Sequence, residues 1–280
     1  MSSISFSTSL PSSITSGPPI SIQELKIRLR KWCDLAKYST EYSSRINAAQ
    51  QIENCYAIGA KSLDLSNNQL TDLPAEIGLL TNLARLDLSN NQLTNLPTEI
   101  GLLTELIFLN LSNNQLTDLP ATIWKLPKLI CLALDNNQLT DLDAEIGKLT
   151  ELKFLFLSNN QLTALPTEIG KLTELEFLFL SNNQLTDLPA EIWKLAKLKT
   201  LELCKNRIPN LDAEFTKFGM NRDQMHSPRC IKVNKMVEKL TQPVQKKNET
   251  NSTPFLMLPL PLVGGHVQLW ELIAEYATRD

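Results

Sequence analysis

The side chains that could act as nucleophiles or transfer protons are few and widely scattered in this sequence. Its two histidines are His226 and His266. Its five cysteines lie far apart, at Cys33, Cys55, Cys131, Cys204 and Cys230. Catalysis needs such groups within hydrogen-bond reach of one another, and zinc sites need closely spaced ligands. The chain also lacks a glycine-rich phosphate loop and a Gly-x-Ser-x-Gly elbow. We therefore predict a non-enzymatic protein without a metal or cofactor.

A second set of residues has a spacing that suits the recognition of another macromolecule. Five of the nine phenylalanines share one 23-residue register: Phe108, Phe154, Phe156, Phe177 and Phe179. Three charged residues occupy equivalent places in the same register: Arg85, Asp87 and Asp135. Exposed aromatic clusters usually mark interaction sites, and charged neighbours set the orientation of a partner. We predict that these eight residues bind a partner. The alternative is that the rings are tolerated because phenylalanine favours strands.

The shared register comes from an internal repeat of 23 residues, present in seven copies from Ala60 to about Leu211. The segment that starts at Leu83 recurs from Leu106, Leu129, Leu152, Leu175 and Leu198, with the pattern L-x-x-L-x-L-x-x-N-x-L. Leu86 and Leu88 alternate with polar residues, which predicts a short strand with one buried face. The third, fifth and seventh positions then point outward. The candidate binding residues all fall on these outward positions.

The remainder of each copy predicts an inward turn followed by a short helical segment. The ninth position is always asparagine, at Asn68, Asn91, Asn114, Asn137, Asn160, Asn183 and Asn206. A carboxamide both donates and accepts, so it can bridge backbone groups of neighbouring coils. In the segment Leu96–Thr104, Pro97 suits a first helical position and Glu99 suits the first turn. We expect this segment on the convex side.

This pattern matches the leucine-rich-repeat signature, and its 23-residue length resembles the intracellular Ras-group type. The resemblance covers a little over half of the chain. It implies an α/β solenoid with a curved parallel sheet, short convex helical turns and a protein-binding concave face. Three positions depart from the pattern: Asp143 replaces a proline, and Trp124 and Trp193 replace glycines.

A helical cap is expected at residues 21–59, before the repeats. Ser21 and Glu24 form a capping-box pattern that opens a helix to about Tyr38. A second helix is expected from about 41 to 58, with Gly59 as its C-cap.

The segment that contains Trp32, Arg45 and Ile52, running directly into the first repeat, resembles the helical cap of LPX-type bacterial type III effectors. In many of those effectors the repeats precede a ubiquitin-ligase domain. Only about 70 residues follow the repeats here, so the resemblance is not extended to ligase activity.

The two ends of the chain have a different character from the repeats. Residues 1–20 are uncharged and rich in serine, which fits either a disordered leader or a type III export signal. Residues 212–242 are expected to form a C-terminal cap, and residues 243–280 a linker and a terminal amphipathic helix. That helix would place Val267, Trp270 and Ile273 on one stripe.

Composition narrows the setting in which the protein acts. A net charge of −3 argues against a nucleic-acid partner, and no apolar run is long enough to span a membrane. The odd, dispersed cysteines favour reduced thiols and a cytoplasmic location, with secretion into a host cell as a further possibility. We expect a monomer that binds a host or signalling protein. Two function classes remain open: a secreted bacterial effector, and an intracellular signalling regulator acting on a small GTPase or kinase.

Overall fold

The computed structural model describes residues 20–209 as two helices followed by seven coils of a solenoid. The helices are α1 (Ile22–Leu35) and α2 (Tyr42–Ile58). Residues 1–19 and 210–280, which hold the predicted leader, C-terminal cap, linker and terminal helix, lie outside the described residues.

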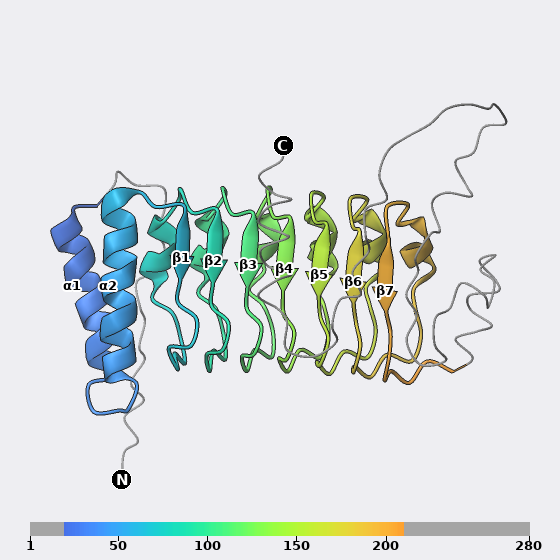
Figure 1. The fold of residues 1–280 in the computed structure, drawn as a ribbon, viewed down its shortest axis with the longest axis horizontal. Coiled ribbons are helices and arrows are strands. Elements are labelled where there is room, and N and C mark those ends of the chain that lie inside the picture. Colours follow the sequence, from blue (N-terminus) through green and yellow to red (C-terminus); the bar gives the residue numbers. More distant parts are fainter. Residues whose placement is uncertain (1–19, 210–280) are drawn as a thin grey trace, which may run out of the picture.

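Each coil contributes one strand of three residues to a parallel sheet. The strands are β1 (Ser62–Asp64), β2 (Arg85–Asp87), β3 (Phe108–Asn110), β4 (Cys131–Ala133), β5 (Phe154–Phe156), β6 (Phe177–Phe179) and β7 (Thr200–Glu202). In the described part of the chain they form one seven-stranded sheet in sequence order (Figure 1). Pairing joins residues 23 apart, such as Leu86 with Leu109. The repeat length therefore sets the register of the whole sheet.

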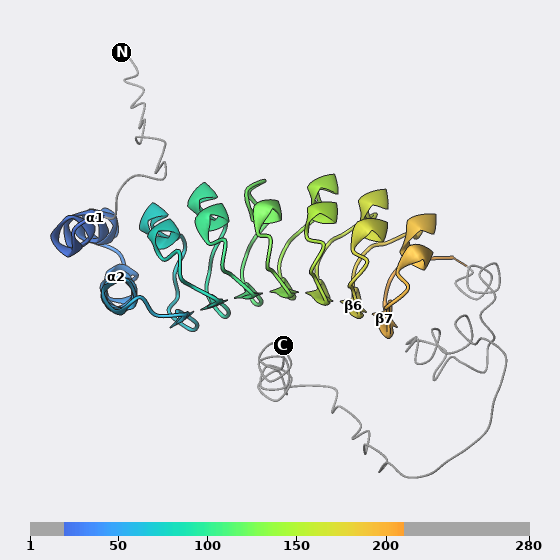
Figure 2. The same ribbon diagram turned by 90° about the horizontal axis from the view of Figure 1, so that it is seen from above.

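The opposite side of the solenoid carries one short 3₁₀ helix between successive strands. These are η1 (Ala75–Leu79), η2 (Thr98–Leu102), η3 (Ile123–Lys125), η4 (Ala144–Lys148), η5 (Thr167–Lys171) and η6 (Ala190–Lys194). Seen from above, the strands line the inner side of a gentle curve and these helices its outer side (Figure 2). The predicted concave sheet and convex turns are thus confirmed, although Pro97 caps η2 rather than occupying its first position.

The core is a continuous column of leucines and isoleucines. The central leucine of a strand and the leucine two residues later, such as Leu86 and Leu88, are fully buried. The convex helices add Ile77, Ile100 and their equivalents to the same cluster, which extends from α1 to β7. Because each coil covers the next, burial of these apolar side chains holds the coils in a stack.

The asparagine ladder closes the turn after each strand. Asn137 is representative: its Nδ2 donates to the carbonyl oxygens of Leu111 and Leu134, each at 3.0 Å. Its Oδ1 accepts from the amide of Leu116, also at 3.0 Å. The same three bonds recur at Asn91, Asn114, Asn160, Asn183 and Asn206. The predicted bridging of neighbouring coils is confirmed for these six asparagines, whereas Asn68 of the first coil donates to the carbonyl of Ser66 and accepts from Asn47 of α2.

The residue before each ladder asparagine adopts a left-handed backbone conformation. Its φ lies between 55° and 58° at Asn67, Asn90, Asn113, Asn136, Asn159, Asn182 and Lys205. Asparagine tolerates this region better than other residues with a side chain. The left-handed residue turns the chain inward, so the ladder asparagine that follows it enters the stack.

The two helices at the start of the chain follow their sequence signals closely. The hydroxyl of Ser21 accepts from the amide of Glu24 at 3.1 Å and caps α1 as predicted. Helix α1 ends at Leu35, three residues before the expected Tyr38. Gly59 ends α2 with φ of 60°, a left-handed C-cap that confirms the predicted role.

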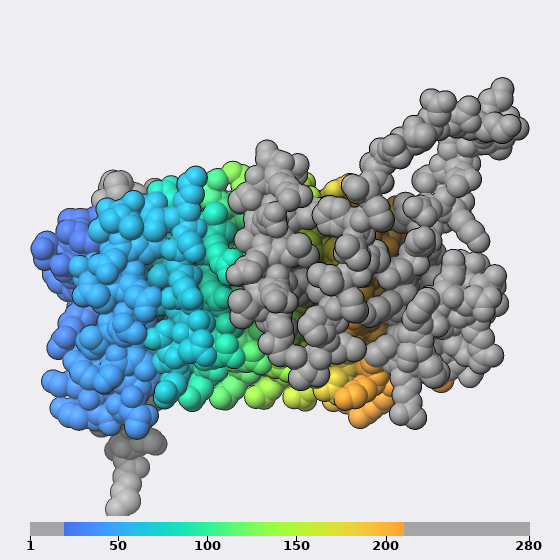
Figure 3. Space-filling view, in the orientation of Figure 1, coloured from blue at the N-terminus to red at the C-terminus, as the bar shows by residue number. Residues whose placement is uncertain are grey.

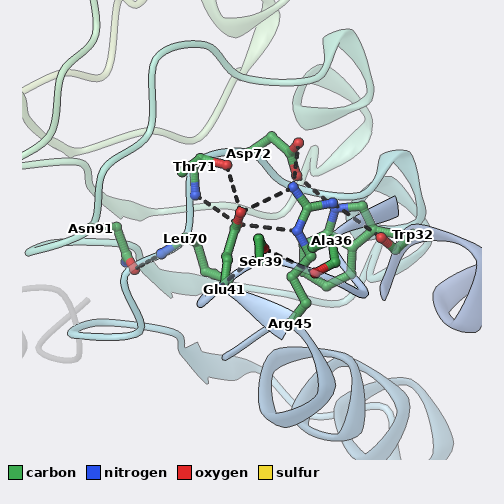
Figure 4. Close-up of polar contacts among 9 residues, drawn as sticks. All are labelled: Trp32, Ala36, Ser39, Glu41, Arg45, Leu70, Thr71, Asp72 and Asn91. Carbon is green, nitrogen blue, oxygen red and sulfur yellow. Dashed lines mark hydrogen bonds and ion pairs between the residues drawn. The ribbon is translucent and has the colours of Figure 1, made fainter. Parts of the chain in front are cut away.

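A buried guanidinium fastens the helical cap to the first coil (Figure 4). Arg45, at 5% exposure, donates to the carbonyl of Trp32 at 3.0 Å and to Asp72 at 2.8 Å. Trp32 donates its indole N–H to the same carboxylate at 2.7 Å. Glu41 pairs with Arg45 and accepts from the amide of Thr71 at 2.9 Å. Helix α2 and the first coils consequently form one continuous surface (Figure 3).

Candidate interaction surface

The candidate binding residues sit on the concave side because each three-residue strand alternates between two faces. The central leucine of each strand enters the core, so the first and third residues point the other way. The phenylalanines of β3 and β5 form a second apolar cluster with Cys131 and Ala133, separate from the leucine core. The structure therefore places all five predicted phenylalanines at or against one patch, which we call the aromatic patch: Phe108, Phe154, Phe156, Phe177 and Phe179.

Four of these rings form two stacked pairs across β5 and β6. The rings of Phe154 and Phe177 have centroids 4.9 Å apart and planes within 4°. The rings of Phe156 and Phe179 have centroids 4.8 Å apart and planes within 3°. In-register parallel pairing places identical side chains directly beside each other, which produces the expected two-by-two arrangement.

The exposure of the rings differs from the sequence-based expectation of a water-exposed cluster. Phe108 and Phe154 are 6% exposed and Phe156 is 4% exposed, whereas Phe177 and Phe179 are half-buried. Phe154 and Phe156 each stack on one ring of β6, and the three buried rings belong to one apolar cluster with Cys131 and Ala133 of β4. The expectation of open rings is therefore wrong for β3 and β5.

Short side chains occupy β4 between the phenylalanines of its two neighbours. Cys131 pairs in register with Phe108 on one side and Phe154 on the other, and both Cys131 and Ala133 are fully buried. Burial raises the pKa of the Cys131 thiol, the charge of Asp135 adds to this, and Arg85 acts in the opposite direction. Since the thiolate is the reactive form, this cysteine is unsuited to nucleophilic chemistry.

Arg85 and Asp87 are both engaged with neighbours on the sheet. The guanidinium carbon of Arg85 lies 4.4 Å from the ring centroid of Phe108, a cation–π contact. Asp87 accepts from the amide and hydroxyl of Ser89 at 3.0 and 2.7 Å, and from Asn110 at 3.2 Å. Arg85 thus extends the aromatic patch. Asp87 instead holds the turn after β2 and links β2 to Asn110 of β3.

Asp135 has a different environment from the other two charged candidates. It is 5% exposed, and its Oδ1 accepts from the amide of Ser158 at 2.8 Å. Its Oδ2 is buried and has no hydrogen-bond partner among the described residues. Burial raises the pKa of this carboxyl to about 7, hydrogen bonds from Ser158 lower it, and the charge of Glu202 raises it further.

Ser112 is a residue that sequence reasoning missed. It occupies the position equivalent to Asp135, one coil earlier, and its Oγ is likewise buried without a hydrogen-bond partner in the described structure. The amide of Asn113 donates to the carbonyl of Asp135 at 2.8 Å, so the two coils are joined at this point. Its seventh position in the repeat is shared with four other serines, so only the unsatisfied hydroxyl in the structure distinguishes it.

The remaining cysteines and acidic side chains are the candidates for redox-active or metal-binding groups. Cys33, Cys55 and Cys131 are free thiols, but Cys204 is disulfide-bonded, so the prediction of reduced thiols throughout is wrong for Cys204. Between residues 20 and 209 no group of three or more His, Cys, Asp or Glu side chains could hold a metal ion. None of the helices described is long and apolar enough to cross a membrane.

Comparison with known families agrees with the geometry. A leucine rich repeat model matches residues 59–116 and 81–139, and a leucine-rich repeat region model matches residues 137–242. Given these matches, the parallel sheet and the asparagine bridges, the chain belongs to the leucine-rich-repeat family. Proteins of this family are typically interaction modules rather than enzymes.

Among solved structures, similar chains include three bacterial proteins. A leucine-rich-repeat protein of Leptospira interrogans is 36% identical, with 64% of this chain and 49% of that chain covered and a TM-score of 0.49. The functional domain of InlJ from Listeria monocytogenes is 31% identical, with 58% and 33% covered and a TM-score of 0.50. The internalin InlF of the same species is 28% identical, with 55% and 43% covered and a TM-score of 0.49.

The chain therefore spans about half or less of the length of each of these structures. A comparison with curated protein sequences found no match.

Proposed function

We propose that this chain is a protein-binding module whose partner packs on the concave sheet over β3 to β6. The observation that carries the proposal is the pair of stacked phenylalanine couples, Phe154 with Phe177 and Phe156 with Phe179, outside the leucine core. The column of coils is already closed by its own leucines and asparagines. The aromatic patch adds apolar surface at positions where β1, β2 and β7 carry only polar or charged residues, which supports a binding role.

The free energy gained by burying a few aromatic rings favours a small contact between the partner and the centre of the concave face. Each phenylalanine ring covered by a partner contributes on the order of 1.5–3 kcal/mol before ordering costs. Two half-buried rings, Phe177 and Phe179, offer the partner a ready apolar contact at the edge of the patch. Arg85, held over Phe108, and Asp135 supply charges of opposite sign that orient the bound partner.

For the biological setting, we propose a secreted bacterial effector that engages a host protein. Support comes from the cap segment around Trp32 and Arg45, which resembles LPX-type effectors, and from the uncharged serine-rich start of the sequence. The likeness to the functional domain of the bacterial InlJ is consistent with this setting. An intracellular signalling regulator acting on a small GTPase or kinase is the second candidate, favoured by the 23-residue repeat length.

Site-specific photocrosslinking tests the binding role. The full chain carrying benzoylphenylalanine in place of Phe179 is incubated with eukaryotic-cell lysate and irradiated. We expect a discrete crosslinked protein that is lost when Phe177 is also changed to serine. The same probe in place of Lys125, on the exposed convex side, is the control and should give no such product.

Crosslinks of equal yield from both faces, or none from the concave face, would contradict the proposal. A translocation assay on residues 1–25 fused to a reporter separates the two settings, because only the effector requires export into a host cell.

A further inference from the structure

We propose that the partner inserts a lysine or arginine side chain beside the aromatic patch, where its N–H groups donate to Asp135 Oδ2 and Ser112 Oγ. This inference rests on the proposed function, since it names the chemistry that the concave surface recognises.

The position of Asp135 in the repeat argues against a purely structural role. The equivalent residue is serine in five of the other coils, at Ser66, Ser89, Ser112, Ser158 and Ser181. The fold of a coil therefore does not need a carboxylate here. Asp135 uses one oxygen to accept from the amide of Ser158 and leaves the other buried without a donor. A buried acceptor without a donor carries an unfavourable desolvation cost, which a donor from a partner would relieve.

Ser112 supplies the second half of the site. Its amide is already used, since it donates to Asn110 Oδ1 at 3.1 Å, whereas its hydroxyl oxygen is buried without a partner within the described structure. The backbone bond from Asn113 to Asp135 joins these two coils, and Ser112 and Asp135 occupy the same outward position of the repeat on them. One group with several N–H donors can satisfy both oxygens. An ammonium has three such donors and a guanidinium has five.

The surroundings suit the aliphatic stem and the charge of such a side chain. Asp135 follows Ala133 by two residues on the same face, and the amide of Leu134 donates to the carbonyl of Phe156 at 2.8 Å. Asp135 therefore lies two residues beyond Ala133, the register partner of Phe156 on β5. Within the chain itself, Arg85 already packs its guanidinium 4.4 Å from the ring of Phe108. The negative charge of Glu202 acts on Asp135 as well, so an anionic group is disfavoured.

Selection from a random peptide library displayed on phage, using the full chain as bait, tests the inference. We expect enriched peptides to carry one lysine or arginine flanked by aromatic or aliphatic residues. Their affinity should fall about 30-fold or more for Asp135→Asn, and replacing the cationic residue of the peptide with methionine should abolish the difference between the two proteins. Asp64→Asn removes the same charge from an exposed position on β1 and should change affinity by less than about threefold.

The outcomes separate this inference from the proposed function. Peptides that bind and that depend on Phe177 and Phe179, but show no cationic enrichment, would overturn the cation site and leave the binding face intact. Failure to select any peptide that depends on the two phenylalanines would overturn both. Ser112→Ala provides a second variant that leaves the carboxylate unchanged, and it should weaken the cationic peptides selectively.

Discussion

The rings of Phe156 and Phe179 stack on neighbouring strands, with centroids 4.8 Å apart and planes within 3° of parallel. Pairs of this kind contribute about 0.5–1.5 kcal/mol beyond the area they bury. We therefore expect a double-mutant cycle with Phe156→Leu and Phe179→Leu, followed by urea denaturation, to give a coupling free energy in that range.

A diagonal pair is the matched control for this cycle. Phe154 and Phe179 lie on the same two strands but are not partners in the register. Their coupling should be clearly smaller. Equal coupling for the stacked and diagonal pairs would show that the rings act only as apolar surface.

The asparagine ladder should be the polar feature most sensitive to mutation. Asn137→Ala leaves the carbonyls of Leu111 and Leu134 and the amide of Leu116 without their partners. At about 1–3 kcal/mol for each buried group left unpaired, the free energy of unfolding should fall by roughly 3 kcal/mol or more.

Gln138→Ala, at the exposed neighbouring position, should change the free energy of unfolding by less than about 0.5 kcal/mol. Denaturant titration of the two variants measures the contrast. A similar cost at both positions would argue against the bridging role.

The cap should loosen when its buried guanidinium is removed. Arg45→Met leaves Glu41 and the carbonyl of Trp32 without their partner, and should cost about 3 kcal/mol. Because coils contact only their neighbours, hydrogen exchange should quicken in α1 and α2 and remain unchanged in β5 and β6.

Lys26→Met is the control for this prediction. Lys26 pairs with Glu53 at 2.9 Å within the same two helices, but its side chain is 45% exposed. Loss of that pair should cost less than about 1 kcal/mol. An equal effect of the two substitutions would contradict a special role for Arg45.

Asp135 should make stability fall as the pH rises. Burial raises the pKa of its carboxyl from 3.8 to about 7 in the folded chain, so the folded state holds the proton more tightly than the unfolded state. Its stabilising contribution is complete below pH 3.8 and is lost as the pH rises through 7.

Asp135→Asn keeps an acceptor for the amide of Ser158 and cannot ionise. It should therefore be more stable than the parent at pH 8, on the order of 2–4 kcal/mol, and nearly equal to it at pH 4. Thermal unfolding of both proteins across this pH range checks the sign, which would be reversed if the carboxylate stabilised the fold.

Much of the fold could be predicted because the repeat encodes it locally. Alternating leucines define strands such as Leu86 in β2, and the ninth asparagine defines the bridge. The end of α1 at Leu35 could not be predicted, because the apolar pattern continues past it without a stop signal. The left-handed residues could have been anticipated from the paired asparagines, since asparagine is the residue with a side chain that best tolerates that conformation.

The candidate site was predicted only in part. Register alone brings Phe154 beside Phe177 and Arg85 beside Phe108. The low exposure of Phe156 and the raised pKa of Asp135 depend on what surrounds them in three dimensions, and a linear pattern carries no such information. Ser112 resembles other serines of the repeat in sequence, and only its unsatisfied hydroxyl distinguishes it.

The asparagine bridges also restrict the lengths that the solenoid can adopt. Each bridge joins a coil only to the one before it, so removal of residues 83–105 would bring equivalent positions together and restore the strand pairing and the bridges in a shorter stack. A deletion whose length is not a multiple of 23 residues would break the bridges on both sides. The distance between the helical cap and the aromatic patch can therefore change only in steps of one strand spacing, about 4.8 Å. Variants of this chain with fewer or more coils would carry the same aromatic patch at a different distance from the helical cap.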